Sequence, residues 1–337
     1  MSEEQRVLEE TAASHSSDSA SGADSRSATA FLFPGQGSQS AGMGKALAES
    51  CPEAAAVFAE ADAALGFSIS QLCFEGSGQD LKPTEVAQPA LLTCSVAALR
   101  CIEARGFRPD AAAGHSLGEY SAMVAAEVIG FREALLLVAK RGKLMSEAGE
   151  RQPGTMAAVL GLDSNRVEAI CRHVTDQGDG VVVPANLNAP GQVVISGAVG
   201  AVRAAGEQAK AAGAARVIPL AVSGAFHSPL MSDAARSLQA ELAKASLKAA
   251  AIPIVCNATA RPTREPADLR AALIAQMASG VRWEESMRTF EEMGITRFVE
   301  VGPGRVLSGL VQKTIPGAIT YNVGEPDGLE RLGAFFA

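Results

Sequence analysis

Residues 114–118 read Gly-His-Ser-Leu-Gly and match the pattern G-x-S-x-G, which constrains the fold of this chain most. A short apolar run at residues 111–113 predicts a buried strand before it, and residues 120–128 predict a helix after it. A strand, a tight turn and a helix are the context of a nucleophile elbow, which presents a serine hydroxyl in a pocket. The two glycines suit the turn, because a Cβ at either position would collide with the neighbouring strand or helix.

Ser116 stands at the centre of this turn and is the predicted nucleophile. The N-terminus of the following helix carries unpaired N–H groups and a partial positive charge, which stabilise an oxyanion. The same pattern also occurs by chance, and a glycine-rich turn with a solvated serine is then the alternative. Residues elsewhere in the chain, above all a base for Ser116, distinguish these two interpretations.

A serine nucleophile needs a base, and the chain has four histidines. His15 lies in the N-terminal tail, and His173 falls near the end of a predicted helix. His115 is adjacent to Ser116, and neighbouring side chains on a sharp turn point apart. His227 lies in a non-helical segment where catalytic groups tend to occur, so we predict it as the base. An acidic residue or a main-chain carbonyl could orient its imidazole, and the spacing alone does not choose between them.

Predicted strands alternate with predicted helices over residues 30–154 and 222–337, which favours a mainly parallel sheet flanked by helices. Residues 155–221 have the order β-α-β-β-α-β, which is the ferredoxin-like pattern. We therefore predict an α/β fold with two parts. Residues 30–154 and 222–337 form a large domain, and residues 155–221 form an inserted small ferredoxin-like α+β domain. Residues 1–29, rich in serine and acidic residues, are predicted to be a disordered tail.

Composition excludes several functional classes. The net charge of −8 argues against a non-specific nucleic-acid binder. Apolar runs are short and interrupted, and none approaches the roughly 20 residues of a membrane span, so we expect a soluble protein without membrane contact. No Cys/His cluster has the spacing of metal ligands, so no metal site is predicted. The six cysteines form no C-x-x-C pair and are expected to be reduced, mostly buried thiols: Cys51, Cys73, Cys94, Cys101, Cys171 and Cys256.

The tail lacks the apolar core of a secretory signal and is too acidic for an intact transit peptide. We expect a cytoplasmic protein, with a plastid or another organelle after removal of a transit peptide as the alternative. Residues 34–39 form a glycine-rich loop without the Lys-Ser/Thr of a P-loop, so nucleotide binding is not predicted. An ordinary strand-to-helix loop is the simplest interpretation of these residues taken alone.

Five segments occur in order along the chain: 33–39 (FPGQGSQ), 114–120 (GHSLGEY), 141–143 (RGK), 225–231 (AFHSPLM) and 300–304 (EVGPG). Together they closely resemble the malonyl-CoA:acyl carrier protein transacylases of fatty-acid synthesis, which are related to the acyltransferase domains of polyketide synthases. The resemblance covers roughly residues 30–325, and several motifs in register are far more specific than G-x-S-x-G alone.

The resemblance implies a ping-pong transfer of malonyl from CoA to the phosphopantetheine thiol of acyl carrier protein, without a bound cofactor. Ser116 matches the nucleophile and His227 the base. The backbone N–H groups of Gln36 and Leu117 match the oxyanion hole. The carbonyl that holds the base matches Gln276, by position rather than by a sharp motif.

Arg141 matches the arginine that binds the free malonyl carboxylate, and a planar guanidinium suits a carboxylate. Phe226 precedes His227 in the Ala-Phe-His form that accompanies malonyl, whereas a Ser-His form accompanies methylmalonyl in related domains. The expected partners are acyl carrier protein and a coenzyme A thioester, and we expect a monomer.

Three alternatives stay open. The chain could be an acyltransferase that serves a polyketide synthase in trans or is excised from one. A serine esterase shares the elbow, but its histidine usually lies near the C-terminus, whereas here residues 228–337 follow His227. A non-catalytic scaffold fits poorly with intact Ser116, His227 and Arg141.

Overall fold

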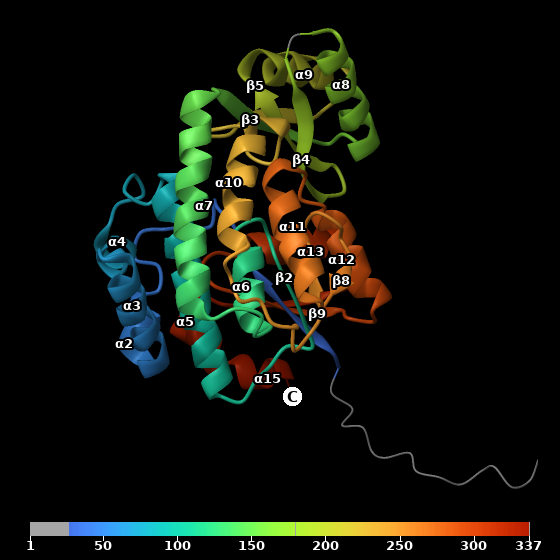
Figure 1. Ribbon diagram of the computed structural model, residues 1–337. Coiled ribbons are helices and arrows are strands. Elements are labelled where there is room, and N and C mark those ends of the chain that lie inside the picture. Colours follow the sequence, from blue (N-terminus) through green and yellow to red (C-terminus); the bar gives the residue numbers. More distant parts are fainter. Residues whose placement is uncertain (1–26, 179, 337) are drawn as a thin grey trace, which may run out of the picture.

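The computed structural model describes residues 27–178 and 180–336, which form two sheets with their helices (Figure 1). The large sheet contains β1 (Thr29–Phe33), β2 (Ala111–Gly114), β7 (Ile254–Val255), β8 (Pro262–Thr263), β9 (Arg297–Val301) and β10 (Ile319–Val323). Most of the predicted tail, residues 1–26, lies outside the described residues, and Thr29 already belongs to β1.

The strand order of the large sheet is β10-β9-β1-β2-β7-β8, and every pair except β7–β8 is parallel. Phe33 and Gly114 are partners at the carboxyl ends of β1 and β2. The loops that follow these two strands therefore begin side by side at one edge of the sheet. This register brings the glycine-rich loop next to the elbow.

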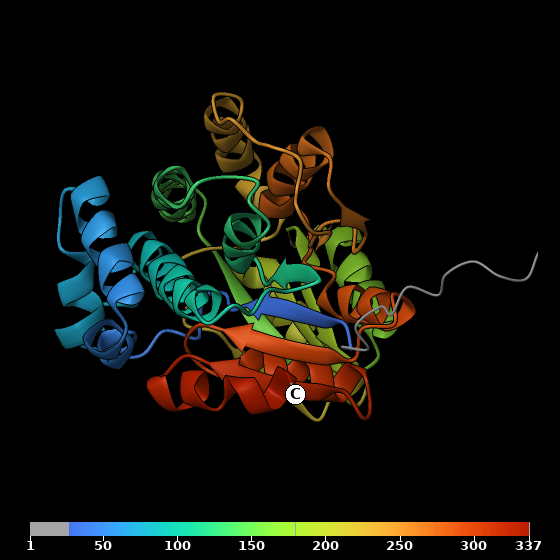
Figure 2. The same ribbon diagram turned by 90° about the horizontal axis from the view of Figure 1, so that it is seen from below.

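Helices cover both faces of the large sheet (Figure 2). The helices that pack on this sheet or on one another around it are α2 (Lys45–Ser50), α3 (Pro52–Leu65), α4 (Ile69–Glu75), α5 (Thr84–Ala104), α6 (Gly118–Ala125), α7 (Phe131–Arg151), α10 (Ser232–Leu242), α11 (Pro266–Ala278), α12 (Trp283–Glu292), α13 (Val306–Thr314), α14 (Pro326–Glu330) and α15 (Leu332–Phe336). A single 3₁₀ turn, Pro229–Met231, precedes α10.

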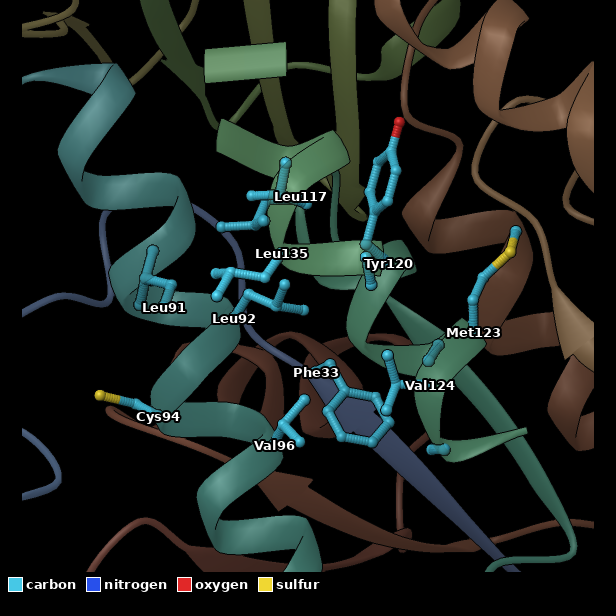
Figure 3. Close-up of a cluster of buried hydrophobic side chains, with 14 of the residues drawn as sticks. Phe33, Leu91, Leu92, Cys94, Val96, Leu117, Tyr120, Met123, Val124 and Leu135 are labelled. Atoms are coloured by element: carbon cyan, nitrogen blue, oxygen red, sulfur yellow. The ribbon is translucent and has the colours of Figure 1, made fainter. Parts of the chain in front are cut away.

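Strand β1 shows how the core is divided between the two faces. Phe31 and Phe33 pack with α5, α6 and α7, whereas Ala30 and Leu32 pack with α12 and α13. Successive side chains of a strand point to opposite faces, so a strand buried on both sides is apolar throughout. Figure 3 shows side chains of α5 and α6 meeting over Phe33, with the hydroxyl end of Tyr120 pointing away from this cluster.

The small sheet contains β3 (Gly154–Leu160), β4 (Val182–Ala189), β5 (Gln192–Ala198) and β6 (Arg216–Pro219) in the antiparallel order β4-β5-β3-β6. Helices α8 (Ser164–Asp176) and α9 (Val199–Ala211) pack on it with their own apolar cluster, at the top of Figure 1. This topology is ferredoxin-like. The predicted α/β fold class is confirmed.

Helix α5 is longer and more continuously apolar than the sequence analysis expects. It has 21 residues and is long and apolar enough, by length and composition, to cross a bilayer. However, 83% of its apolar window is buried inside the protein, where it packs among α3, α6 and α7. The expectation that no apolar segment reaches spanning length is therefore wrong for α5, which is a core helix.

The cysteine prediction is wrong for one pair. Cys51 and Cys101 form a disulfide, with their Cα atoms 6.4 Å apart. Cys51 caps the start of α3 and Cys101 lies in α5, so the packing of α3 on α5 brings them together. No sequence spacing marks two cysteines that are 50 residues apart. The other four cysteines are free and buried.

Candidate active site

Ser116 lies in a sharp turn between β2 and α6. Its φ is 52°, in the left-handed region that a side chain rarely adopts. A Cβ on Gly114 would overlap the backbone of Gly118, and a Cβ on Gly118 would overlap the carbonyl oxygen of Phe33. Glycine is therefore required at both positions, as the sequence predicts, because the turn and β1 leave no room for side chains.

The side chains of Ser116 and His227 meet directly. Oγ of Ser116 lies 2.7 Å from Nε2 of His227, and Nδ1 of His227 lies 2.7 Å from the main-chain carbonyl oxygen of Gln276. A carbonyl only accepts, so Nδ1 carries the proton and Nε2 accepts from the Ser116 hydroxyl. Burial, and then the nearby Arg141 cation, lower the pKa of His227 to about 3, so its imidazole is neutral at pH 7.

The glycine-rich loop approaches the elbow closely. A Cβ on Gly35 would overlap the carbonyl oxygen of His115. Gln36 and Leu117 both line the cleft that contains Ser116. In residues 27–178 and 180–336, neither the Gln36 N–H nor the Leu117 N–H donates to a protein acceptor. Both groups therefore keep their donor capacity for a bound oxyanion.

Arg141 projects from α7 into the interior and is fully buried. Its Nη1 donates to Oε1 of Gln88 at 2.7 Å, and its Nη2 donates to Oε1 of Gln276 at 2.8 Å and to Oγ of Ser116 at 3.1 Å. Its Nε has no hydrogen-bond partner within the described residues. A guanidinium has five N–H donors, so Arg141 keeps spare donors beside the nucleophile.

The cleft around Ser116 has a volume of about 310 Å³. Phe226 and His227 line it from the segment before α10, and Lys82 and Gln39 line it from the loops before α5 and α2. Asn186 of β4 and residues 220–222 complete it, so the small sheet forms one wall. Phe226 is 5% exposed and its ring is therefore a buried part of this wall.

Sequence reasoning missed three polar side chains at this site: Gln88, Glu119 and Asn257. Oδ1 of Asn257 accepts from the Ser116 N–H at 2.6 Å, and its Nδ2 donates to the Gly114 carbonyl at 2.7 Å. Asn257 follows β7, so its position at the carboxyl end of a parallel strand was the available signal. Glu119 lies next to the elbow motif, so its position was a signal as well. Gln88 is a single amide in an apolar helix, and no sequence pattern marks it.

The remaining histidines do not reach the Ser116 hydroxyl. His115 turns towards the small sheet, where its Nε2 lies 2.8 Å from Oδ1 of Asn188. His173 is exposed on α8 and bonds to Gln177. His15 lies outside the described residues. No group of three or more His, Cys, Asp or Glu side chains that could hold a metal ion occurs in the described part of the chain.

The fold and the site together define an acyl transferase, and a family model for the acyl transferase domain matches residues 30–323. The malonyl CoA-acyl carrier protein transacylase of Bacillus subtilis (strain 168) is 48% identical over 301 residues, which are 89% of this chain and 95% of that protein. The Escherichia coli (strain K12) enzyme of the same name is 43% identical over 301 residues, covering 89% and 97%. The chain therefore belongs to the malonyl CoA-acyl carrier protein transacylase family.

Solved structures agree with this assignment. The malonyl CoA-acyl carrier protein transacylase from Coxiella burnetii superimposes with a TM-score of 0.89 at 38% identity, covering 92% of this chain and 98% of that chain. A malonyl-transacylase in complex with its type II polyketide synthase acyl carrier protein superimposes with a TM-score of 0.88 at 41% identity, covering 90% and 98%.

Proposed function

We propose that this chain transfers malonyl from malonyl-CoA to the phosphopantetheine thiol of acyl carrier protein through a malonyl ester of Ser116. The observation that carries the proposal is the contact of Ser116 Oγ with both the neutral base His227 and the buried cation Arg141. The base activates the hydroxyl, and the cation offers N–H donors to the free carboxylate of the malonyl group.

In the first half-reaction, Ser116 Oγ attacks the thioester carbonyl while Nε2 of His227 takes the hydroxyl proton. The developing oxyanion accepts hydrogen bonds from the N–H groups of Gln36 and Leu117. The C–S bond then breaks, and His227 returns the proton to the CoA sulfur. The products are CoA thiol and the malonyl ester of Ser116.

The second half-reaction runs the same steps with the carrier thiol. His227 takes the thiol proton, the thiolate attacks the ester carbonyl, and the C–O bond breaks. His227 then protonates Ser116 Oγ. The carbonyl of Gln276 keeps Nδ1 protonated throughout, which leaves Nε2 as the proton acceptor in the resting enzyme.

Arg141 selects the acyl group. A malonyl group carries a free carboxylate that an acetyl group lacks, and pairing it with a buried guanidinium gives charge-assisted hydrogen bonds. The Phe226 ring occupies the cleft wall beside the base and leaves less room for an α-methyl substituent.

The experiment is the intact mass of the protein after incubation with malonyl-CoA, and separately with acetyl-CoA and methylmalonyl-CoA. We expect one malonyl adduct on the wild-type protein and none on Ser116→Ala. A malonyl adduct on Ser116→Ala would contradict the assignment of Ser116 as the nucleophile. An ester lost rapidly to water, with no dependence on a carrier thiol, would favour an esterase.

Fatty-acid synthesis is the proposed pathway. A polyketide synthase is the second candidate, because one similar structure is a malonyl-transacylase bound to a polyketide carrier protein. Transfer rates to a fatty-acid carrier and to a polyketide carrier, measured side by side, distinguish the two. We further propose that the enzyme acts as a cytoplasmic monomer without a bound cofactor. Gel filtration with light scattering and metal analysis of the purified protein test the monomer and the cofactor parts.

A further inference from the structure

Gln276 links four parts of the active site. Its main-chain carbonyl accepts from Nδ1 of His227, and its side-chain Oε1 accepts from Nη2 of Arg141 at 2.8 Å. Its Nε2 donates to the Ser116 carbonyl at 2.7 Å and to Oε2 of Glu119 at 2.8 Å. Gln276 is fully buried, so this side chain has no water to replace a lost partner.

The orientation of this amide matters for Arg141. A glutamine amide has one end that accepts and one that donates, and a rotation by 180° would turn the NH₂ group towards the guanidinium. Donor would then face donor, and Nη2 would lose its acceptor. The two acceptors on the NH₂ side, from Ser116 and Glu119, hold the productive orientation, and an ionised acceptor forms the stronger bond.

Glu119 is placed for this role by the elbow itself. It lies in the first turn of α6, three residues after Ser116, and its side chain is fully buried. The Asn257 N–H points to its other oxygen at 3.4 Å. Burial raises the pKa of Glu119 to about 7, against the hydrogen bonds from Gln276 and its neighbours, so the carboxyl is ionised in an assay at pH 8.

We propose that Glu119 is a positioning residue for malonyl transfer: by accepting from Nε2 of Gln276, it fixes the amide that holds Arg141 beside Ser116. The inference rests on the proposed role of Arg141 as the partner of the malonyl carboxylate. Glu119 touches neither the reacting atoms nor the acyl group, and it acts through Gln276.

The test compares malonyl and acetyl transfer in single-turnover acylation of Ser116 at pH 8. Glu119→Gln keeps the size of the side chain but removes its charge and allows either end of its amide to face Gln276. We expect the malonyl rate to fall about 10- to 100-fold, the range of one buried hydrogen bond to a charged group. The acetyl rate, which does not use Arg141, should fall much less. Glu119→Asp keeps the charge but is too short to reach Gln276, and should lower the same ratio.

Glu300→Gln is the matched control. Glu300 is also a buried carboxylate, but it accepts from the N–H groups of Leu307 and Ser308 at the start of α13. We expect its malonyl-to-acetyl ratio to equal that of the wild type, whatever happens to its thermal stability. A merely structural role of Glu119 would give the same result as this control.

A double-mutant cycle shows whether Glu119 acts through Gln276. In a Gln276→Ala background, which keeps the main-chain carbonyl, Glu119→Gln should change the ratio no further. Multiplicative effects in the double variant, or equal losses of malonyl and acetyl transfer in Glu119→Gln, would overturn the positioning role. An unchanged ratio in Arg141→Ala would instead overturn the proposed function of Arg141, and this inference with it.

Discussion

Oγ of Ser116 lies 2.7 Å from Nε2 of His227, although 111 residues separate them in the sequence. Both residues adopt positive φ, 52° and 57° respectively. A non-glycine residue in this conformation costs about 1–3 kcal/mol and persists only where its surroundings fix it. Asn257 and Gln276 supply that support through hydrogen bonds to the Ser116 N–H and to the His227 ring. The pair is therefore held in place before substrate binds.

The role of the base can be tested with His227→Asn. The Asn amide can still donate to the Gln276 carbonyl, but it offers no basic nitrogen to Ser116. We expect acylation by malonyl-CoA to slow by about 10²- to 10⁴-fold, the usual contribution of a general base. Rapid-quench intact mass measures this rate. His173→Asn, on the exposed face of α8, should acylate at the wild-type rate. A wild-type rate in His227→Asn would mean that another group takes the proton.

The role of Arg141 is tested with two substitutions. Arg141→Ala removes every donor, and we expect malonyl transfer to fall about 10²- to 10⁴-fold, as for two hydrogen bonds to a charged group. Acetyl transfer should fall far less. Arg141→Lys keeps the charge but not the planar fork, so it should restore only part of the malonyl rate. Steady-state kcat/KM for both acyl-CoA substrates measures the ratio, and equal losses would refute a role in selecting malonyl.

Much of the fold could be predicted because local signals and tertiary structure agree. Helix α3 shows this agreement at both ends, since Pro52 starts it and Gly66 ends it in the left-handed conformation. Helices α4, α14 and α15 carry weaker local signals, because they have only five to seven residues each. Such short helices depend on packing rather than on periodicity. Asp163 caps α8, and its side chain accepts from the Asn165 N–H.

The site was less accessible from sequence for a physical reason. The elbow is a local pattern, so Ser116 and its glycines could be named from spacing alone. Its partners come from distant segments, and only the family resemblance pointed to Arg141, Gln36 and Gln276. The side chain of Gln276, the orientation of Glu119 and the Cys51–Cys101 disulfide needed the packed structure, because each depends on which helices meet.

Phe226 offers a test of acyl-group size. Phe226→Leu and Phe226→Ala remove successively more of the ring from the cleft wall, so the ratio of methylmalonyl to malonyl transfer should rise in that order. Because Phe226 is buried, the alanine variant should also lose about 3–5 kcal/mol of stability. Competition between the two CoA esters, read by intact mass, gives the ratio. A ratio that stays constant across the series would assign selection to other residues.

The pH dependence of stability provides a test of the buried imidazole. The pKa of His227 is lowered to about 3 in the folded protein, from 6.5 in the unfolded chain. Between these values only the unfolded chain binds the proton. The contribution of His227 to the free energy of unfolding is therefore fully present above pH 6.5. It is lost as the pH falls towards 3, by about 1.4 kcal/mol per pH unit.

In His227→Asn this contribution disappears. The free energy of unfolding of the wild type minus that of the variant should therefore fall as the pH is lowered from 7 to 4.5. Urea titrations at several pH values measure this difference. The contributions of the other titrating groups, Glu119 included, are common to both proteins and cancel in it. A difference that is constant with pH would show that His227 protonates normally in the folded state.

The disulfide predicts a thiol count. Denatured, unreduced protein should expose four reactive thiols, and reduction should release two more, because Cys51 and Cys101 are paired and the other four are free. Cys51→Ser should lower the free energy of unfolding by about 4 kcal/mol, the loop-closure entropy of a 50-residue loop. Cys171→Ser, at a buried free cysteine, is the control and should lower the unreduced count to three. Six reactive thiols before reduction would show that α3 and α5 pack without a covalent link.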